Sequence, residues 1–137
     1  YPYEWSFFQL KSAALHHLDY QIFLLEKNAV LIDASAYNIQ FKNNKPIFID
    51  LLSLDKYKDG DYWIGYNQFL QEFLNPLLLQ SIKGITFNNW YKGNLNGIHT
   101  EDLNKVLDIK DKISLNVYLH VVLLAKLTRL PLLLKLS

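Results

Sequence analysis

The stretch DASAYNIQFKNNKPIFID, residues 33–50, decides the fold. It joins a polar loop to two β-prone segments, residues 38–41 and 46–49, which are separated by the tetrapeptide KNNK. Asparagine tolerates the positive φ angles that a tight hairpin turn demands. We therefore predict an antiparallel hairpin, with Asp33 before it and Asp50 after it.

The sequence before this stretch predicts one long helix over residues 7–27. Ser6 followed by Gln9 has the pattern of a capping box. Four apolar residues recur downstream at three- and four-residue spacing, which favours an amphipathic helix: Leu15, Leu18, Ile22 and Leu25. Asn28 suits a left-handed helix end, and the short apolar run at residues 29–32 then leads into the polar loop.

The sequence after this stretch is predominantly helical. Residues 55–61 read as a charged loop, after which helical spacing from Tyr62 to Leu77 is broken by Asn75-Pro76. Residues 88–97 are rich in Gly and Asn and predict a second loop. Two further helices are expected after the caps Thr100 and Ser114, the last running toward Leu127. The fold class is therefore α+β, mainly α, with one domain over residues 1–137.

Composition limits the function classes. The chain has 14 basic and 13 acidic residues, so its net charge of +1 gives no field that would attract nucleic acid. It has no Cys, which excludes thiolate metal sites and fits a cytoplasmic location. Charged residues and Pro131 interrupt the apolar stretch at residues 113–134, so no membrane span is expected. The chain begins without Met, as a piece of a longer protein would.

The hairpin brings together the residues that can carry chemistry. Asp33, Asn38 and Asp50 should converge at one end of it and offer the oxygen ligands that Mg²⁺ prefers. In phosphoryl transfer the first Asp orients or deprotonates the acceptor, while an Asn and a second Asp hold Mg²⁺ against the nucleotide phosphates. The alternative is structural: Asp33 and Asn38 form turns and Asp50 caps a helix. Metal-dependent phosphate hydrolysis is a weaker alternative, because it needs more ligands.

These motifs resemble a known superfamily. Residues 33–39 and 47–50 resemble the catalytic loop and the metal-binding Asp of aminoglycoside phosphotransferases and choline kinases, within the kinase-like superfamily. The resemblance is closer to bacterial proteins described as SAM-dependent methyltransferases, which carry a kinase-like segment ahead of the methyltransferase domain. They share YPYEWSF at residues 1–7 and a QFL-x-x-FL-x-PLLL run at residues 68–79.

The resemblance implies a protein-kinase-like C-terminal lobe with a Mg²⁺–ATP phosphotransferase site. Asp33 would be catalytic, Asn38 and Asp50 would bind the metal, and Tyr3 and Glu4 would lie at the hinge that meets adenine. The partners implied are the missing N-lobe and a neighbouring domain of the parent protein, and self-association through exposed apolar surface is open. Any SAM site would lie in a part of the parent that is absent here.

The sequence also departs from the kinase pattern. No Gly-rich loop and no strand Lys precede the hinge, so the chain alone is not expected to be a competent kinase. A non-catalytic, pseudokinase-like interaction module is therefore the main alternative. Tyr37, inside the loop, is expected either to shape the acceptor pocket or to pack beneath it. His16 and His17 are adjacent on the predicted helix and point about 100° apart, so one of them is expected to be buried and the other to be at the surface.

Overall fold

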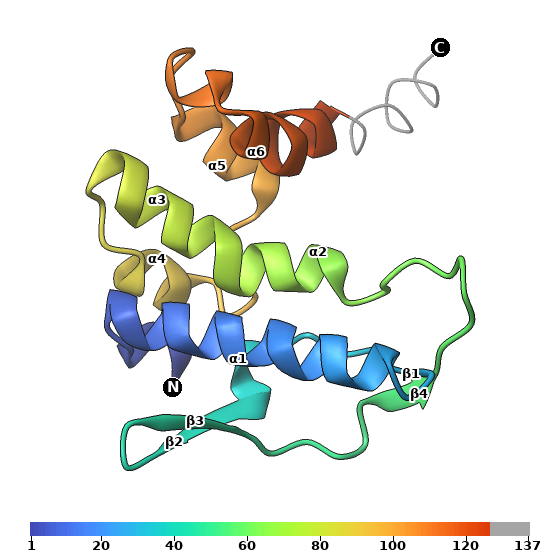
Figure 1. Cartoon of the computed structure of the whole chain (residues 1–137). Helices are drawn as coiled ribbons and strands as arrows, with labels where there is room; N and C mark the ends of the chain where they lie inside the picture. Colours follow the sequence, from blue (N-terminus) through green and yellow to red (C-terminus); the bar gives the residue numbers. More distant parts are fainter. Residues whose placement is uncertain (127–137) are drawn as a thin grey trace.

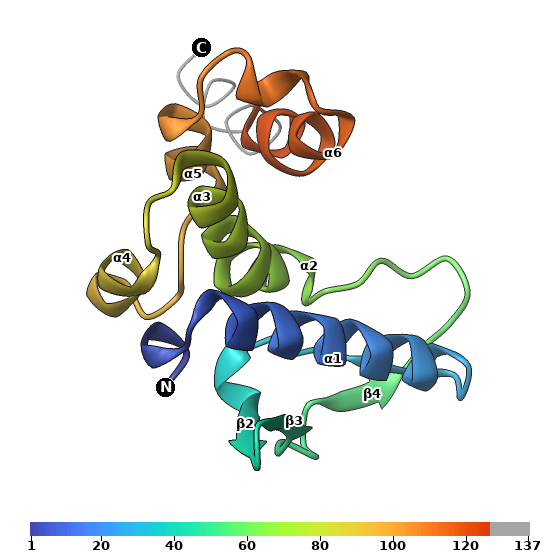
Figure 2. The same cartoon turned by 60° about the vertical axis from the view of Figure 1, so that its left-hand side comes forward.

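The computed structural model describes residues 1–126 and has a mainly helical α+β fold. Helix α1 (Phe7–Leu25) lies between two layers, as the two views in Figures 1 and 2 show. On one side are two small sheets, and on the other a long helical rod that packs against α1. The α+β, mainly α prediction is confirmed.

Helix α1 begins and ends where the sequence predicts. Ser6 Oγ accepts the N–H of Gln9 at 3.2 Å, and Gln9 Oε1 accepts the N–H of Ser6 at 2.9 Å, so the capping box is complete. Asn28 follows the helix with a φ of 57°. The predicted apolar face was wrong in part, because Leu15 and Ile22 are exposed. The face that packs on the core contains six other residues, at positions that repeat every three or four residues: Leu10, Ala13, Ala14, His17, Gln21 and Leu24.

The strands form two separate antiparallel pairs. The predicted hairpin consists of β2 (Ile39–Lys42) and β3 (Lys45–Phe48), and its turn residues Asn43 and Asn44 have φ angles of 49° and 61°. The second pair joins β1 (Ala29–Leu31) to β4 (Leu54–Lys56). The sequence predicted the start of a charged loop at the position of β4, because a strand of three exposed residues carries no apolar alternation.

The helical rod combines α2 (Tyr66–Phe69), a π-helical segment η3 (Leu70–Leu74) and α3 (Asn75–Lys83). The predicted break at Asn75-Pro76 is therefore wrong: the rod continues through it, with Pro76 in the first turn of α3. Proline has no N–H and its ring crowds the preceding turn, and the backbone just before it widens to π geometry. The N–H of Asn75 bonds to the carbonyl of Leu70 rather than to an α-helical partner.

A neighbouring loop uses the carbonyl of Gln71 in this π segment. The N–H of Ile98 bonds to the Gln71 oxygen at 2.9 Å. Gly97, with a φ of 82°, brings the loop so close that a Cβ at this position would lie 2.1 Å from the same oxygen. Asn75 Nδ2 bonds to the Ile98 carbonyl and to Thr100 Oγ1, so Asn75 anchors this loop instead of capping a helix.

The remaining elements are short. A 3₁₀ turn η1 (Pro2–Glu4) precedes α1, and helix α4 (Asn88–Gly93) lies where the sequence predicted only a loop. Beyond it the described chain contains α5 (Thr100–Val106), η4 (Asp111–Ile113), α6 (Leu115–Val117) and the π segment η5 (Tyr118–Leu123). His99, not Thr100, is the N-cap of α5, whereas Ser114 is the N-cap of α6 as predicted. The predicted helix end at Leu127 lies outside the described residues.

Candidate functional site

The loop that carries Asp33 and Asn38 follows strand β1 and ends in the 3₁₀ turn η2 (Ala36–Asn38). The side chain of Asp33 accepts the N–H of Ser35 through Oδ1 at 2.9 Å, which closes a local turn. The hydroxyl of Ser35 accepts the N–H of Tyr37 at 3.2 Å. The loop therefore has a defined conformation that its own short polar side chains favour.

A buried carboxylate from the helical rod holds the same loop. Glu72, only 4% exposed, accepts the N–H of Ala36 at 2.7 Å and the hydroxyl of Ser35 at 3.0 Å, both through Oε2. Gln68, one turn earlier, donates to Glu72 Oε1 at 3.3 Å and accepts the N–H of Ala34 at 3.0 Å. Two residues of the rod, Gln68 and Glu72, thus accept hydrogen bonds from three consecutive loop residues, and neither was predicted from the sequence.

The electrostatics of Glu72 are set by its burial. Loss of water raises the pKa of the Glu72 carboxyl above its usual range, against the hydrogen bonds from Ala36, Ser35 and Gln68, which lower it. The negative charge of Asp33 adds to the increase. A signal for this residue existed in the sequence: Glu72 is the only acid between Asp61 and Glu101 and directly precedes the mainly apolar run FLNPLLL, and a lone acid on a buried face needs partners.

Asp50 lies after strand β3 and forms a second local turn. Its Oδ1 accepts the N–H of Leu52 at 2.9 Å and its Oδ2 accepts the hydroxyl of Ser53. The bond from Ser53 and then the bond from Leu52 lower the pKa of the Asp50 carboxyl below its usual range. The helix cap considered for Asp50 is wrong, because strand β4 and not a helix follows this turn.

Backbone bonds draw Asp33, Asn38 and Asp50 toward one place. The carbonyl of Asn38 accepts the N–H of Ile49, the residue before Asp50, at 2.9 Å. The carbonyl of Ser53, whose hydroxyl bonds to Asp50, accepts the N–H of Ile32, the residue before Asp33, at 2.9 Å. The hairpin and the β1–β4 pair thus join the chain segments that carry Asp33, Asn38 and Asp50, at a place that we call the junction. The Nδ2 of Asn38 is buried there without a hydrogen-bond partner.

The other residues singled out from the sequence lie as follows. Tyr3 is half-buried, and its carbonyl accepts a bond from Asn88 Nδ2 at 2.9 Å, while Glu4 is exposed. Tyr37 packs beneath the loop, with its ring 6.4 Å from that of Tyr91 and its hydroxyl enclosed, so it does not line an open acceptor pocket. A nucleotide-binding role for Tyr3 and Glu4 stays a prediction.

His17 is the buried member of the histidine pair, as predicted. Its ring is fully buried among Phe48, Trp63, Phe69 and Phe73, with ring centroids between 5.6 and 6.2 Å away. Neither ring nitrogen has a hydrogen-bond partner. Burial lowers the pKa of His17 to about 4, with the nearby Asp33 charge opposing this decrease. His17 is therefore a buried ring that stays neutral at pH 7, and it lies close to Asp33.

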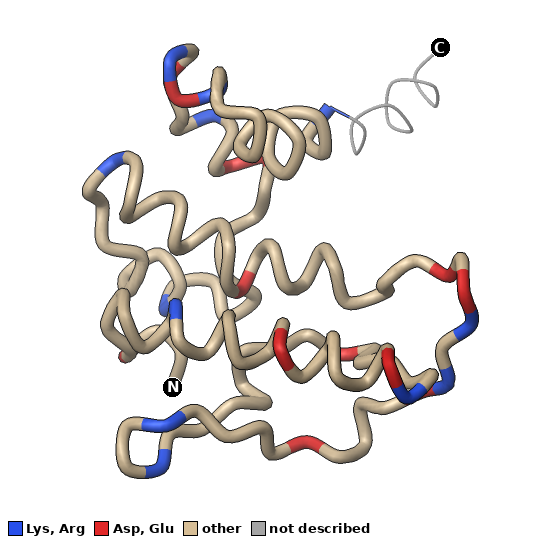
Figure 3. Tube along the Cα trace, viewed as in Figure 1, with Lys and Arg blue, Asp and Glu red and all other residues tan. Residues whose placement is uncertain are grey.

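The described part of the chain offers few metal ligands. Among residues 1–126 no group of three or more His, Asp or Glu side chains is gathered closely enough to hold a metal ion. Acidic residues are dispersed over the molecule, as the coloured trace in Figure 3 shows. A cation at the junction would depend on Asp33, Asp50 and the amide of Asn38. Within residues 1–126, no helix is sufficiently long and apolar to cross a bilayer.

The fold and this junction define a mainly helical α+β unit with a polar loop site. Comparison with known proteins finds similarity to nodulation protein NoeA of Rhizobium meliloti, which is 49% identical over 127 residues. The match covers 93% of this chain and 27% of NoeA, so the chain spans about a quarter of the length of that curated relative. No protein-family model and no solved structure matches the chain.

These comparisons correct the resemblance drawn from the motifs. The assignment to aminoglycoside phosphotransferases, choline kinases and kinase-bearing methyltransferases is wrong: the similarity found is to a nodulation protein, and no such family matches. A kinase-like C-lobe is likewise not confirmed. The physical reason is that short Asp and Asn spacings are weak signals, since both acids here also close local turns through their own side chains.

Proposed function

We propose that the junction of Asp33, Asn38 and Asp50 binds a Mg²⁺–phosphate ligand such as ATP. The observation that carries this proposal is the buried Glu72 carboxylate beneath the loop, because burying a carboxylate costs free energy. The hydrogen bonds that offset this burial come from Ser35 and Ala36, and they hold the loop in one fixed conformation. A preorganised loop that presents oxygen donors is what a metal or phosphate site requires.

The donor set is compatible with Mg²⁺. This ion takes oxygen ligands and is typically held by one or two carboxylates together with phosphate oxygens and water. Two aspartates and one asparagine amide meet that need without a larger acidic cluster. The bonds that Asp50 accepts from Leu52 and Ser53 fix its carboxylate in the way that outer-shell bonds orient metal ligands. Bound Mg²⁺ would supply charge neutralisation for the phosphate groups.

Calorimetric titration of the full-length protein with ATP tests this proposal. Binding is expected in the presence of Mg²⁺ and should be lost with excess chelator. The variant Asp50→Asn should weaken binding at least about tenfold, since it removes one of two carboxylates at the cation. The matched control is Asp19→Asn, the same change at an exposed position of α1. Absence of Mg²⁺-dependent binding in the unmodified protein would end the proposal.

A second candidate function is a non-catalytic interaction module that docks another part of the same longer protein. The observation that favours it is an exposed apolar turn after β3, with Leu51 74% and Leu52 91% exposed. Ile49 beside them is 54% exposed. Contiguous apolar side chains in water are unfavourable and mark contact surfaces. The relative NoeA extends well beyond the matched region, so chain able to cover this turn is available in a protein of that length.

Limited proteolysis of the full-length protein distinguishes this second candidate. Leu52→Asp should release the docked part and expose new cleavage sites near residues 49–54. Leu95→Asp is the matched control, because Leu95 is 55% exposed in a loop elsewhere. Identical cleavage patterns for Leu52→Asp and the unmodified protein would exclude docking at this turn, and a change of oligomeric state in Leu52→Asp would indicate self-association instead.

A further inference from the structure

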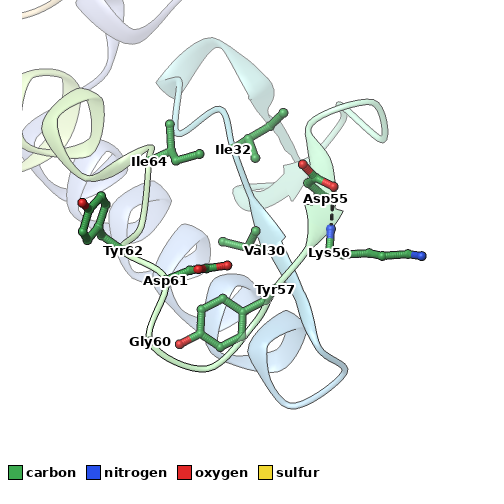
Figure 4. Close-up of a pocket in the computed structure, with 9 residues that line it drawn as sticks. All are labelled: Val30, Ile32, Asp55, Lys56, Tyr57, Gly60, Asp61, Tyr62 and Ile64. Carbon is green, nitrogen blue, oxygen red and sulfur yellow. Dashed lines mark hydrogen bonds between the residues drawn. The ribbon is translucent and has the colours of Figure 1, made fainter.

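A cavity of about 510 Å³ lies over the β1–β4 pair, outside the Asp33 junction. Its volume falls within the roughly 300–1,000 Å³ that small-molecule pockets occupy. Figure 4 shows its floor and walls. Val30 and Ile32 come from β1 and the residue after it, and Asp55 lies directly opposite Val30 in the strand register. Residues paired in this way project on the same face of a sheet.

The far wall is the loop between β4 and α2, and local bonds define its shape. The N–H of Asp61 bonds to the carbonyl of Lys58 at 3.0 Å, and Gly60 within this turn has a φ of 96°. The indole of Trp63 donates to the Leu31 carbonyl at 3.0 Å and ties the end of the loop to β1. One wall of the cavity is therefore a turn whose two ends are tied to β1, by the β1–β4 pairing and by Trp63.

The polar groups of the cavity are mostly negative. Asp61 accepts the N–H of Lys58 through Oδ2 at 3.3 Å, and Asp55 accepts the N–H of Lys56 through Oδ1 at 2.7 Å. Carboxylates have further lone pairs, so each can accept from a ligand as well. In Figure 4 the Asp61 carboxylate points toward Val30, whereas the Lys56 ammonium extends away from the cavity.

Aromatic and aliphatic surface completes the lining. The ring of Tyr57 lies beside Asp61 at one end of the lining in Figure 4, and Ile64 and Ile32 lie at the opposite end, where Asp55 also lies. A tyrosine ring attracts cations through the negative charge of its face. An aliphatic floor with carboxylates and an aromatic ring around it matches a ligand that is apolar at one end and cationic at the other.

We propose that this cavity binds a small organic cation: an ammonium or guanidinium group attached to an apolar body. The cationic head lies between Asp61 and the Tyr57 ring, and the apolar body packs on Val30, Ile32 and Ile64. An anionic ligand is disfavoured here by the two carboxylates. The cavity therefore differs in ligand charge from the phosphate site proposed at Asp33, and the two proposals stand or fall separately.

Nuclear magnetic resonance titration of the whole isotope-labelled chain tests this inference. Phenethylammonium is the probe, phenethyl alcohol its neutral counterpart and hydrocinnamate its anionic counterpart. The cation should produce saturable shifts at the amides of Val30, Tyr57 and Ile64. Asp61→Asn should weaken its binding about threefold, as expected for one partly exposed charge pair. Asp59→Asn, the same change in the same turn but outside the cavity lining, should bind as the unmodified chain does.

Several outcomes would overturn the inference. One is equal binding of phenethyl alcohol and phenethylammonium; another is equal binding by Asp61→Asn and Asp59→Asn; a third is the absence of saturable shifts at the three amides. Nα-acetyl-lysine methylamide, whose side-chain ammonium stays free, serves as a further probe. If it binds and phenethylammonium does not, the cavity takes a lysine side chain of a polypeptide, and the small-molecule form is wrong. Tyr57→Leu, which removes the ring beside Asp61, provides a second variant if Asp61→Asn fails to fold.

Discussion

The loop at residues 33–38 and the segment at residues 50–64 lie side by side but are built in opposite ways. In the loop, Glu72 and Gln68 satisfy the backbone from below and every side chain is at least half-buried. In the segment, most side chains are exposed, and the bonds made by Asp50, Asp55 and Asp61 are local. The difference indicates that the loop at residues 33–38 is a rigid platform and that the segment at residues 50–64 is an adaptable wall beside it. This arrangement is common to binding sites.

Removing the buried carboxylate of Glu72, which holds the loop, should have the largest effect on stability. Glu72→Ala leaves the Ala36 N–H and the Ser35 hydroxyl buried without partners, so we expect a loss of about 3 kcal/mol in unfolding free energy. Urea denaturation measures it. Glu26→Ala at the exposed end of α1 is the control and should change stability by less than about 0.5 kcal/mol. A small loss in Glu72→Ala would mean that the loop is not held as described.

Low pH should destabilise the folded chain through protonation of His17, which is buried close to the loop. The pKa of His17 is about 4 in the folded chain and 6.5 is its usual value, so the unfolded chain takes up a proton first as pH falls. Stability from the neutral ring is present above pH 6.5 and lost on the way to pH 4, by about 3 kcal/mol at most. Glu72, with its raised pKa, acts in the opposite direction over the acid range.

His17→Leu isolates this effect from other titrating groups. The variant replaces an unpartnered imidazole by an apolar side chain of similar size, so at neutral pH its stability should match or exceed that of the unmodified chain. Between pH 6.5 and 4 the difference between the two should grow in favour of the variant. Parallel stability profiles across this range would show that His17 does not titrate as a buried group.

Removing the bond between Trp63 and strand β1, which ties the segment at residues 50–64 to the strand before the loop, should lower stability moderately. Trp63→Phe keeps an aromatic ring beside His17 but removes the indole bond to the Leu31 carbonyl. We expect a loss of about 1 kcal/mol, together with faster amide hydrogen exchange in residues 57–64 and unchanged exchange in the loop at residues 33–38. Equal acceleration in both regions would show that they open as one unit, contrary to the comparison.

The smallest effect is expected at the exposed turn of the segment. Leu52→Asp places a charge on a side chain that is 91% exposed, so the stability of this chain should change by less than about 0.5 kcal/mol. Thermal denaturation provides the measurement. A substantial loss would mean that Leu52 packs against the chain itself and is not part of a contact surface for another segment.

Local signals in the sequence predicted part of this fold. The capping box of Ser6 and Gln9 and the asparagines of the hairpin turn act over a few residues, so their pattern fixes a local conformation. Strand β4 and the continuous rod through Pro76 were missed, because each depends on a distant partner: β1 for the strand, and the loop at Gly97 for the π segment. Tertiary contacts override local propensity in both cases.

The candidate site was predictable to a similar extent. The hairpin between Asn38 and Asp50 was predicted correctly, whereas the convergence of the Asp33, Asn38 and Asp50 side chains stays a prediction. Glu72 and Gln68 were not found, because they follow the loop by more than thirty residues and their side chains reach it only through packing of the rod. The same short motif also produced the wrong family resemblance, since turn-forming residues recur at this spacing for structural reasons.

Paramagnetic Mn²⁺ used in place of Mg²⁺ tests the central claim most directly. In the isotope-labelled chain, resonances near Asp33, Asn38 and Leu51 should broaden first as Mn²⁺ is added with ATP, because the ion binds at that junction. Asp50→Asn should abolish this early broadening. Broadening that begins instead at exposed acids such as Asp59, or that is unchanged in Asp50→Asn, would contradict a cation site at the junction.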